Sequence, residues 1–171
     1  MCGDSLVLNS IFKYQITKMQ KSAIISDCKK YRYELRRTWD PIKPRVLFIC
    51  LNPSTADCEL EDNTSRVCIN YAKRWGYGGL VIANLFAFRS TDNSKLYLVN
   101  DPVGSENDKH IKRLSDEAVE TICAWGNEGG YKDRDVKVLS YLKNPKCLVK
   151  LKSGRPGHPL YKSKNLKTIS L

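Results

Sequence analysis

The sequence predicts an α/β fold of three layers, in which helices cover both faces of a central, mainly parallel four-stranded sheet. Two runs, 45–51 and 80–86, are almost entirely apolar and rich in β-forming residues, as in strands that are buried on both faces. Strand and helix patterns alternate along the chain, which is the order found in layered α/β proteins. Sharp breaks such as Asn52-Pro53-Ser54 separate the predicted elements.

The N-terminal part of the chain precedes this alternation. Residues 1–30 predict an N-terminal arm or short helix, because alternation of apolar and polar residues is poor there. The next stretch, 31–39, alternates apolar side chains with charged ones, and places Arg32, Glu34 and Arg36 on the same side. This pattern predicts a strand.

The remaining elements follow in regular order. No repeat, low-complexity tract or flexible linker interrupts the chain, so residues 1–171 are expected to form one domain. In chain order, we expect a helix that begins at Asn63 or Thr64 and stops at Gly76, a helix that ends at Ala118, a strand over 121–125, a helix over 133–142 and a strand over 147–151.

Positive charge is concentrated toward the two ends of the sequence. The net charge is +11, yet residues 46–142 carry eleven Lys and Arg against fourteen Asp and Glu. Residues 1–45 carry ten against four, and residues 143–171 carry eight and no acid. A basic rim around a polar site would attract phosphate groups, whereas the alternative is a solvated lysine surface that only keeps the protein soluble. Charge alone leaves both interpretations open.

The cysteines and the apolar runs exclude several classes of protein. The seven cysteines include no C-x-x-C pair, and only His110 and His158 could assist them as metal ligands. We therefore expect reduced thiols in a cytoplasmic protein, and neither a metal site nor a cofactor. No apolar run reaches about 18 residues, so no membrane association is expected, and the run 6–8 is too short for a secretory signal.

Polar residues follow each of the four predicted core strands at the point where the strand ends. The carboxyl ends of parallel strands meet at one edge of a sheet, where polar ligands of α/β proteins bind. The sequence therefore predicts a shared site at this edge. Its candidate residues are Asn52, Ser54, Thr55, Asp57 and Asp62 after the first strand, Asn84 in the second, Trp125 and Gly126 after the third, and His158 after the last.

Each of these residues also has an ordinary structural explanation. Asn52 could bend a turn, and Asp57 and Asp62 could be solvated loop carboxylates. Asn84 lies inside an apolar strand and needs hydrogen-bond partners, which either a structural network or a ligand could supply. His158 lies in a stiff loop between Gly and Pro, and not on an apolar helical face. The convergence of these residues on one edge is what favours a functional site.

The same four segments resemble motifs of the uracil-DNA glycosylase superfamily. The matching residues are Cys50-Leu51-Asn52-Pro53-Ser54, Asn84, Trp125-Gly126 and His158-Pro159, in the same order over residues 45–161. The whole chain also resembles a family of bacterial, archaeal and phage proteins known only as a domain of unknown function. That likeness includes the hallmark motifs Leu51-Asn52-Pro53-Ser54-Thr55-Ala56-Asp57, Asn84-Leu85-Phe86-Ala87-x-Arg89 and His158-Pro159-Leu160-Tyr161.

The first resemblance implies a uracil-DNA glycosylase-like fold and an N-glycosidase that releases a base from a nucleotide or a nucleic acid, with DNA favoured over RNA. Asn52 would hold the attacking water, Asp57 or Asp62 would stabilise the sugar cation, Asn84 would read a base edge, and His158 would donate to the leaving base. Stacking partners and phosphate ligands for the substrate would come from Arg66, Phe86, Arg89, Arg155 and Tyr161.

Two other classes of function remain open. A non-catalytic module could bind a nucleotide or a modified nucleic acid and release it intact. Alternatively, Asp57 and Asp62 could hold a divalent metal in a nucleotide hydrolase or transferase. No G-x-x-x-x-G-K-[ST] sequence occurs, which argues against a P-loop NTPase.

Overall fold

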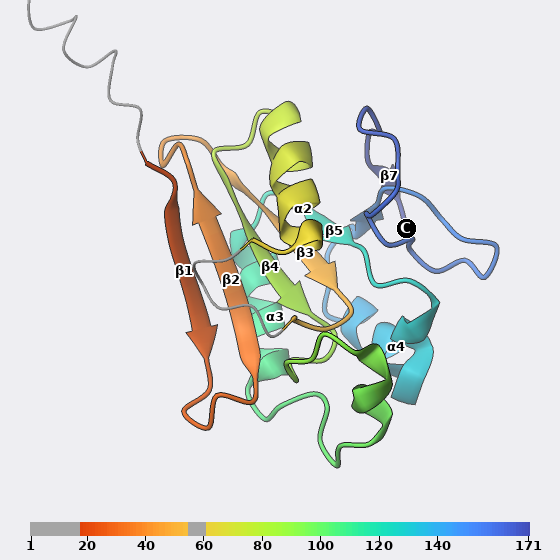
Figure 1. Cartoon of the computed structure of the whole chain (residues 1–171). Helices are drawn as coiled ribbons and strands as arrows, with labels where there is room; N and C mark the ends of the chain where they lie inside the picture. Colours follow the sequence, from red (N-terminus) through yellow and green to blue (C-terminus); the bar gives the residue numbers. More distant parts are fainter. Residues whose placement is uncertain (1–17, 55–60) are drawn as a thin grey trace, which may run out of the picture.

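The computed structural model describes residues 18–54 and 61–171 and confirms the α/β class. A single mixed sheet of seven strands runs in the order β1-β2-β4-β3-β5-β6-β7 (Figure 1). The strands are β1 Gln20–Ile25, β2 Arg32–Thr38, β3 Arg45–Cys50, β4 Gly79–Asn84, β5 Thr121–Cys123, β6 Lys146–Cys147 and β7 Ile169–Ser170. The helices described are α2 Asn63–Arg74, α3 Asn107–Glu117 and α4 Arg134–Leu139, with 3-10 helices η1 Asn93–Tyr97 and η2 Asn127–Asp133.

The sheet is larger than the four-stranded one that the sequence predicts. Its centre consists of parallel pairs, because β3 pairs in parallel with both β4 and β5, and β5 with β6. Antiparallel strands extend it on both sides: β1 and β2 beyond β4, and β7 beyond β6. The outer strands β1 and β7 are partly exposed or short, and β2 is mostly buried but carries charged residues, so none of the three has the continuous apolar run that marks β3 and β4 in the sequence.

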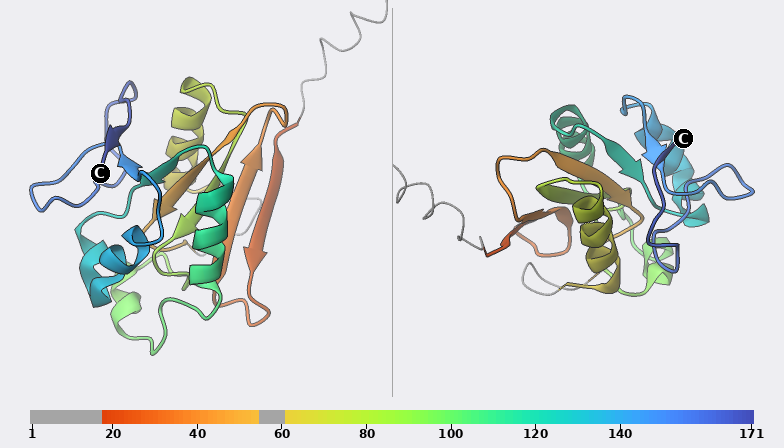
Figure 2. Two further views of the ribbon diagram at one scale, coloured as in Figure 1. Left: turned by 180° about the vertical axis from the view of Figure 1, so that it is seen from behind. Right: turned by 90° about the horizontal axis from the view of Figure 1, so that it is seen from above.

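Helices cover both faces of the sheet, as the apolar runs predict. Successive side chains of a strand point to opposite faces, so Phe48 of β3 packs in the cluster that contains α2. Its neighbours Leu47 and Ile49 pack in a second cluster with Ile111 of α3 and Val138 of α4. The views in Figure 2 show α2 on one side of the sheet and α3 with α4 on the other. No described helix is long and apolar enough to cross a membrane.

Three predicted elements differ from the structure. Residues 20–25 form strand β1 instead of an arm or helix, because they pair with β2 at the edge of the sheet. The strand predicted over 147–151 is shortened to Lys146–Cys147, and the chain then turns back through a bridge between Lys150 and Pro156. The helix predicted over 133–142 ends at Leu139.

A β-bulge interrupts β2. Ile24 of β1 lies opposite Glu34, yet the next residue, Ile25, lies opposite Arg32, so Tyr33 is the extra residue on β2. An extra residue breaks the strict alternation of faces. Tyr33 accordingly stacks on His110 of α3, with ring centroids 4.9 Å apart, and Arg32 is turned toward the opposite face from Glu34.

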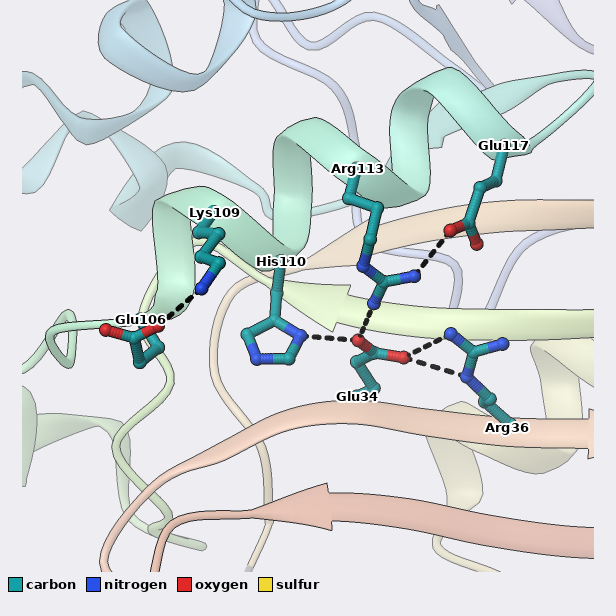
Figure 3. A network of polar contacts seen from close by, with 7 residues as sticks. All are labelled: Glu34, Arg36, Glu106, Lys109, His110, Arg113 and Glu117. Carbon is teal, nitrogen blue, oxygen red and sulfur yellow. Dashed lines mark hydrogen bonds and ion pairs between the residues drawn. The ribbon is translucent and has the colours of Figure 1, made fainter.

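The charged side of β2 is buried under α3 by a network around Glu34, which is fully buried (Figure 3). Its carboxylate accepts hydrogen bonds from Nδ1 of His110 at 2.5 Å, from Nε of Arg36 at 2.8 Å and from the Arg113 guanidinium. Burial alone would raise the pKa of Glu34, but these donors lower it below its ordinary value. The network explains how a strand with charged residues on both faces joins the core.

Candidate functional site

A polar cleft of about 640 Å³ lies at the carboxyl ends of β3, β4 and β5. Segments that are far apart in the sequence meet there, because three neighbouring parallel strands end at the same edge of the sheet. The start of α2 and the loop that contains His158 complete its walls. Of the residues predicted from the sequence, those that line the cleft are Asn52, Ser54, Asp62, Asn84, Trp125, Gly126 and His158.

The other predicted residues are not among those that line the cleft. Phe86 is buried in the core against Tyr131, with ring centroids 5.7 Å apart. Arg155 donates to Asp135 at 2.6 Å beside a neighbouring pocket. Tyr161 is exposed and lines a separate groove.

Two of the predicted arginines bind main-chain carbonyls. Arg66 donates to the carbonyl oxygen of Glu61 at 2.9 Å, and Arg89 donates to that of Lys29 at 3.1 Å. Neither belongs to the cleft wall. Thr55 and Asp57 lie outside the described residues.

The amide of Asn52 has a fixed orientation. Its Nδ2 donates to the carbonyl oxygens of Ser90 at 2.8 Å and of Pro53 at 3.3 Å. A carbonyl oxygen only accepts hydrogen bonds, so the NH₂ group of the Asn52 side chain must face both carbonyls. Oδ1 then remains as an acceptor. The backbone N–H of Ser90 also donates to Pro53 at 2.9 Å, which ties the loops after β3 and β4 together. Asn52 can therefore present an acceptor to a water molecule or a ligand.

Asp62 is the N-cap of α2. Its carboxylate accepts the backbone N–H of Ser65 and the hydroxyl of Ser54, both at 2.7 Å. Burial alone would raise the pKa of Asp62, but these hydrogen bonds and the positive charge of Arg32 lower it below its ordinary value. Asp62 is consequently a carboxylate at neutral pH and gives the cleft a fixed negative charge.

His158 is held as a neutral hydrogen-bond donor. Its Nδ1 accepts the backbone N–H of Leu160 at 3.3 Å, so in the neutral ring the proton resides on Nε2. Burial lowers the pKa of His158, although the nearby charges of Asp62 and Glu128 oppose this effect. The ring is thus neutral at physiological pH and can donate from Nε2.

Asn84 carries a buried donor that no residue of the described ranges satisfies. The side chain is only 2% exposed, and its Nδ2 has no hydrogen-bond partner within 18–54 and 61–171. The indole Nε1 of Trp125, another buried residue of the cleft wall, is also without a partner in those ranges. Buried polar groups are nearly always paired, so a donor without a partner in these ranges is a candidate for binding a ligand acceptor.

The backbone that carries Asn84 is clamped from the opposite face of the sheet. Asn107, at the start of α3, donates through Nδ2 to the carbonyl oxygens of Asn84 and Leu85, each at 3.0 Å. Arg134 of α4 donates to the same Leu85 carbonyl at 2.8 Å. Both residues are buried. They fix the end of β4 and hence the position of the Asn84 amide.

Arg32 is a cleft residue that the sequence analysis did not assign to the site. It is only 3% exposed, lies on β2, and reaches the cleft wall because of the bulge at Tyr33. Burial lowers its pKa to about 10, so it remains a cation at neutral pH. The alternation of 31–39 places Arg32 on the same side as Glu34, and no sequence feature marks the bulge that separates them.

The rim of the cleft is built from exposed polar residues that were also missed. Asn93 donates to Glu128 at 2.9 Å, which joins η1 to η2 across the opening. Asn127 accepts the hydroxyl of Ser153 at 2.6 Å. These residues come from loops whose polar composition is ordinary for surface turns, so the sequence does not distinguish them.

Metal-binding side chains do not cluster in the described ranges. Within them, no three His, Cys, Asp or Glu side chains lie close enough to share a metal ion. The predicted metal-dependent alternative depends on Asp57, which lies outside these ranges.

The fold and the cleft together define a layered α/β protein with a polar site at the carboxyl edge of its parallel strands. The model of the family described as "Protein of unknown function (DUF1643)" matches residues 32–160, and the chain belongs to this family. The matched region begins at Arg32 and ends at Leu160, and both residues line the cleft. No curated protein and no solved structure matches the chain.

Proposed function

We propose that the cleft is the active site of an N-glycosidase that releases a base from a nucleotide or a nucleic acid, with a fold like that of uracil-DNA glycosylases. The observation that carries this proposal is the meeting of Asn52, Asn84 and His158 in one cleft. The adjacent parallel strands β4, β3, β5 and β6 support it, since the site lies at their carboxyl edge.

The residues of the cleft suit the charges that develop when a glycosidic bond breaks. The bond between C1′ and the base nitrogen breaks, its electron pair leaves with the base, and a water oxygen adds to C1′. Oδ1 of Asn52 would orient that water, and the carboxylate of Asp62 would stabilise the positive charge on the sugar. The water proton ends on the departing base, so that the products are a free base and a sugar hydroxyl.

The base would be held by donors. Nε2–H of His158 is available for a base oxygen on which negative charge develops, and the buried guanidinium of Arg32 would stabilise the same charge. Nδ2 of Asn84, which has no partner in 18–54 and 61–171, would donate to a second acceptor on the base edge. Such donors stabilise an anionic leaving group more than the neutral base, which is the requirement for catalysis.

The test is a mass-spectrometric assay for free base, with nucleotides and with single-stranded and duplex DNA that carry normal and modified bases. We expect release by the wild-type protein and none by Asn52→Ala or His158→Ala. Asn100→Ala is a matched control, because Asn100 is exposed and lies outside the cleft wall, and it should keep full activity. Unchanged turnover in both cleft variants would exclude the assignment.

The second candidate function is a binding module. It is favoured by the hydrogen bonds that the acidic residues of the cleft wall already accept from the protein. The acids of the described cleft wall are Asp62 and Glu128, and both already accept hydrogen bonds from the protein. A site without a free carboxylate base would bind a ligand and return it intact. Recovery of unchanged nucleotide from a saturable complex supports this candidate, whereas loss of turnover with a chelator would indicate a metal-dependent hydrolase or transferase.

A further inference from the structure

A second groove, of about 200 Å³, lies further along the same helix α2 that lines the cleft. Thr64 and Ser65, in the first turn of α2, line the cleft, and Tyr71, about 9 Å further along the helix, lines the groove. The opposite wall shows the same continuity, since His158 belongs to the cleft and Tyr161 to the groove. The two hollows therefore share the same two walls.

The outer wall of the groove is fixed to α2 by hydrogen bonds. The hydroxyl of Tyr71 donates to the carbonyl oxygen of Ser163 at 2.7 Å. The indole of Trp75 donates to that of Leu166 at 3.1 Å. These bonds hold the C-terminal segment beside α2, as the ribbon in Figure 1 also shows. The groove is thus a built feature of the fold.

The two segments that form the groove carry only positive charge. Neither 63–78 nor 157–171 contains an Asp or a Glu. Their exposed cationic residues are Arg66, Lys73, Arg74, Lys162, Lys164 and Lys167. A groove lined by both apolar and cationic side chains suits a strand of nucleic acid, which presents bases and phosphates side by side.

Tyr161 is the most exposed large side chain of this surface. It is 100% exposed and has a φ of 59°, in the left-handed region that residues other than glycine rarely adopt. Because the ring of Tyr161 lies in solvent, it does not stabilise the core, and core packing does not explain the strained backbone. Tyr161 lies three residues after the cleft residue His158 and lines the groove.

We infer that the groove between α2 and residues 159–164 binds single-stranded DNA and leads one of its bases into the cleft. Tyr161 would stack on a neighbouring base, and Lys162 and Lys164 would neutralise phosphates. It follows that the substrate is a polymer and not a free nucleotide. This conclusion about the substrate rests on the function proposed for the cleft. Binding in the groove can be measured without that function.

The experiment measures the affinity of the full chain for a fluorescent single-stranded DNA 12-mer over a range of salt concentrations. Tyr161→Ala should weaken binding about tenfold, and Tyr161→Phe should restore it, because stacking needs only the ring. Lys162→Ala/Lys164→Ala should reduce the slope of log affinity against log salt by about 1.4, since each phosphate contact on a single strand contributes about 0.7.

The matched control is Lys109→Ala/Lys143→Ala. It also removes two positive charges, but from exposed residues that do not line the groove. Both the affinity and the salt slope should stay unchanged. An equal loss in the control and the groove variant would show general attraction of a polyanion and overturn the inference. So would unchanged binding by Tyr161→Ala, or binding to heparin or acidic lipid vesicles as tight as to DNA.

A cleft variant separates this inference from the proposed function. Asn52→Ala should keep groove binding, because Asn52 does not line the groove. If no base is ever released but DNA binding depends on Tyr161, the groove assignment stands and the glycosidase proposal fails. If bases are released from mononucleotides and DNA binding ignores Tyr161, the groove assignment fails alone.

Discussion

At the scale of single residues, one hydrogen bond determines how His158 can meet a ligand. The backbone N–H of Leu160 occupies Nδ1, which leaves Nε2–H as the donor of the neutral ring. Protonation of Nδ1 would break this bond and place a charge in a half-buried position. The arrangement therefore stabilises the neutral ring, in agreement with the lowered pKa of His158.

The lowered pKa predicts how the site responds to pH. Because burial disfavours the charged ring, a lower pH than usual is needed to protonate it, and function that requires neutral His158 should persist below pH 6.5, the ordinary pKa of the group. An NMR titration of the two histidines, with His158→Gln to assign the signals, measures the midpoint. A midpoint for His158 above 6.5 would contradict the prediction.

Asp62 combines a structural and an electrostatic role, which two substitutions can separate. Asp62→Ala removes the N-cap of α2 and should cost about 1 kcal/mol in the free energy of unfolding. Asp62→Asn keeps an oxygen for the Ser65 N–H, so stability should change little while the negative charge is lost. If that charge stabilises a cation in the reaction, base release by Asp62→Asn should fall about 100-fold or more. Equal turnover with wild type would limit Asp62 to capping.

At the scale of elements, the clamp on the end of β4 connects α3 and α4 to the cleft. Asn107→Ala removes two hydrogen bonds to strand carbonyls and should lower the free energy of unfolding by about 2 kcal/mol. Because the Asn84 amide would also lose its fixed position, ligand affinity should fall about tenfold. Thermal denaturation and ligand titration measure the two effects.

A substitution on the same helix controls for stability alone. Ile111→Val shortens a buried side chain of α3 and should cost about 1 kcal/mol. Ile111 does not line the cleft and makes none of the hydrogen bonds that hold the end of β4. If Ile111→Val weakens ligand binding as much as Asn107→Ala does, the effect of Asn107 is general destabilisation and not positioning.

The network around Glu34 fastens β2 to α3. Glu34→Gln leaves the guanidinium groups of Arg36 and Arg113 without their buried charged partner and should lower the free energy of unfolding by about 3 kcal/mol at pH 7. Glu117→Gln affects the same Arg113 through a half-exposed pair and should cost less than about 1 kcal/mol.

The lowered pKa of Glu34 also sets the direction of a pH effect. The ionised carboxylate of Glu34 stabilises the folded protein at any pH above the pKa of this group in the unfolded chain, which is about 4.3. As the pH falls through the lower pKa of the folded state, the carboxylate is protonated and this stabilisation is lost. The difference between wild type and Glu34→Gln in urea denaturation should therefore shrink as the pH falls below about 4. A difference in stability that stays constant across this pH range would contradict the conclusion that Glu34 is ionised in the folded protein.

The elements that the sequence predicts best are the strands that are buried on both faces. Strands β3 and β4 are covered on both faces, so nearly every residue is apolar and the run is visible in the sequence. Strand β1 has one exposed side, and its alternation is carried by residues such as Lys21 and Ser22 that are common in loops. Burial of β2 depends on partners in α3, which no local pattern reveals.

At the scale of the whole molecule, the same topology explains which part of the site was predictable. Parallel strands end at one edge, so Asn52, Asn84 and Trp125 could be brought together from strand order alone. Arg32 comes from an antiparallel strand and enters the cleft through a bulge, which requires knowledge of the pairing register. The chain belongs to a family, but the roles of these residues stay predictions.

The packing of the whole molecule also protects four cysteines. Cys50, Cys68, Cys123 and Cys147 are buried thiols, and burial raises the pKa of Cys68, Cys123 and Cys147. Alkylation of the native protein, followed by peptide mass mapping, should label exposed Cys28 rapidly and these four only at the rate of global unfolding. Rapid labelling of any of the four would show that the core opens locally.

The extra residue at Tyr33 has a consequence for the tolerance of this strand to change in length. Deletion of Tyr33 would make Arg32 and Glu34 direct neighbours in a regular strand, still opposite Ile25 and Ile24, so both side chains would keep their present faces. The guanidinium of Arg32 would stay on the side of the cleft, and the loss would be the ring that stacks on His110. A shortened protein should thus retain its sheet and the positive charge of its cleft while losing one contact between β2 and α3.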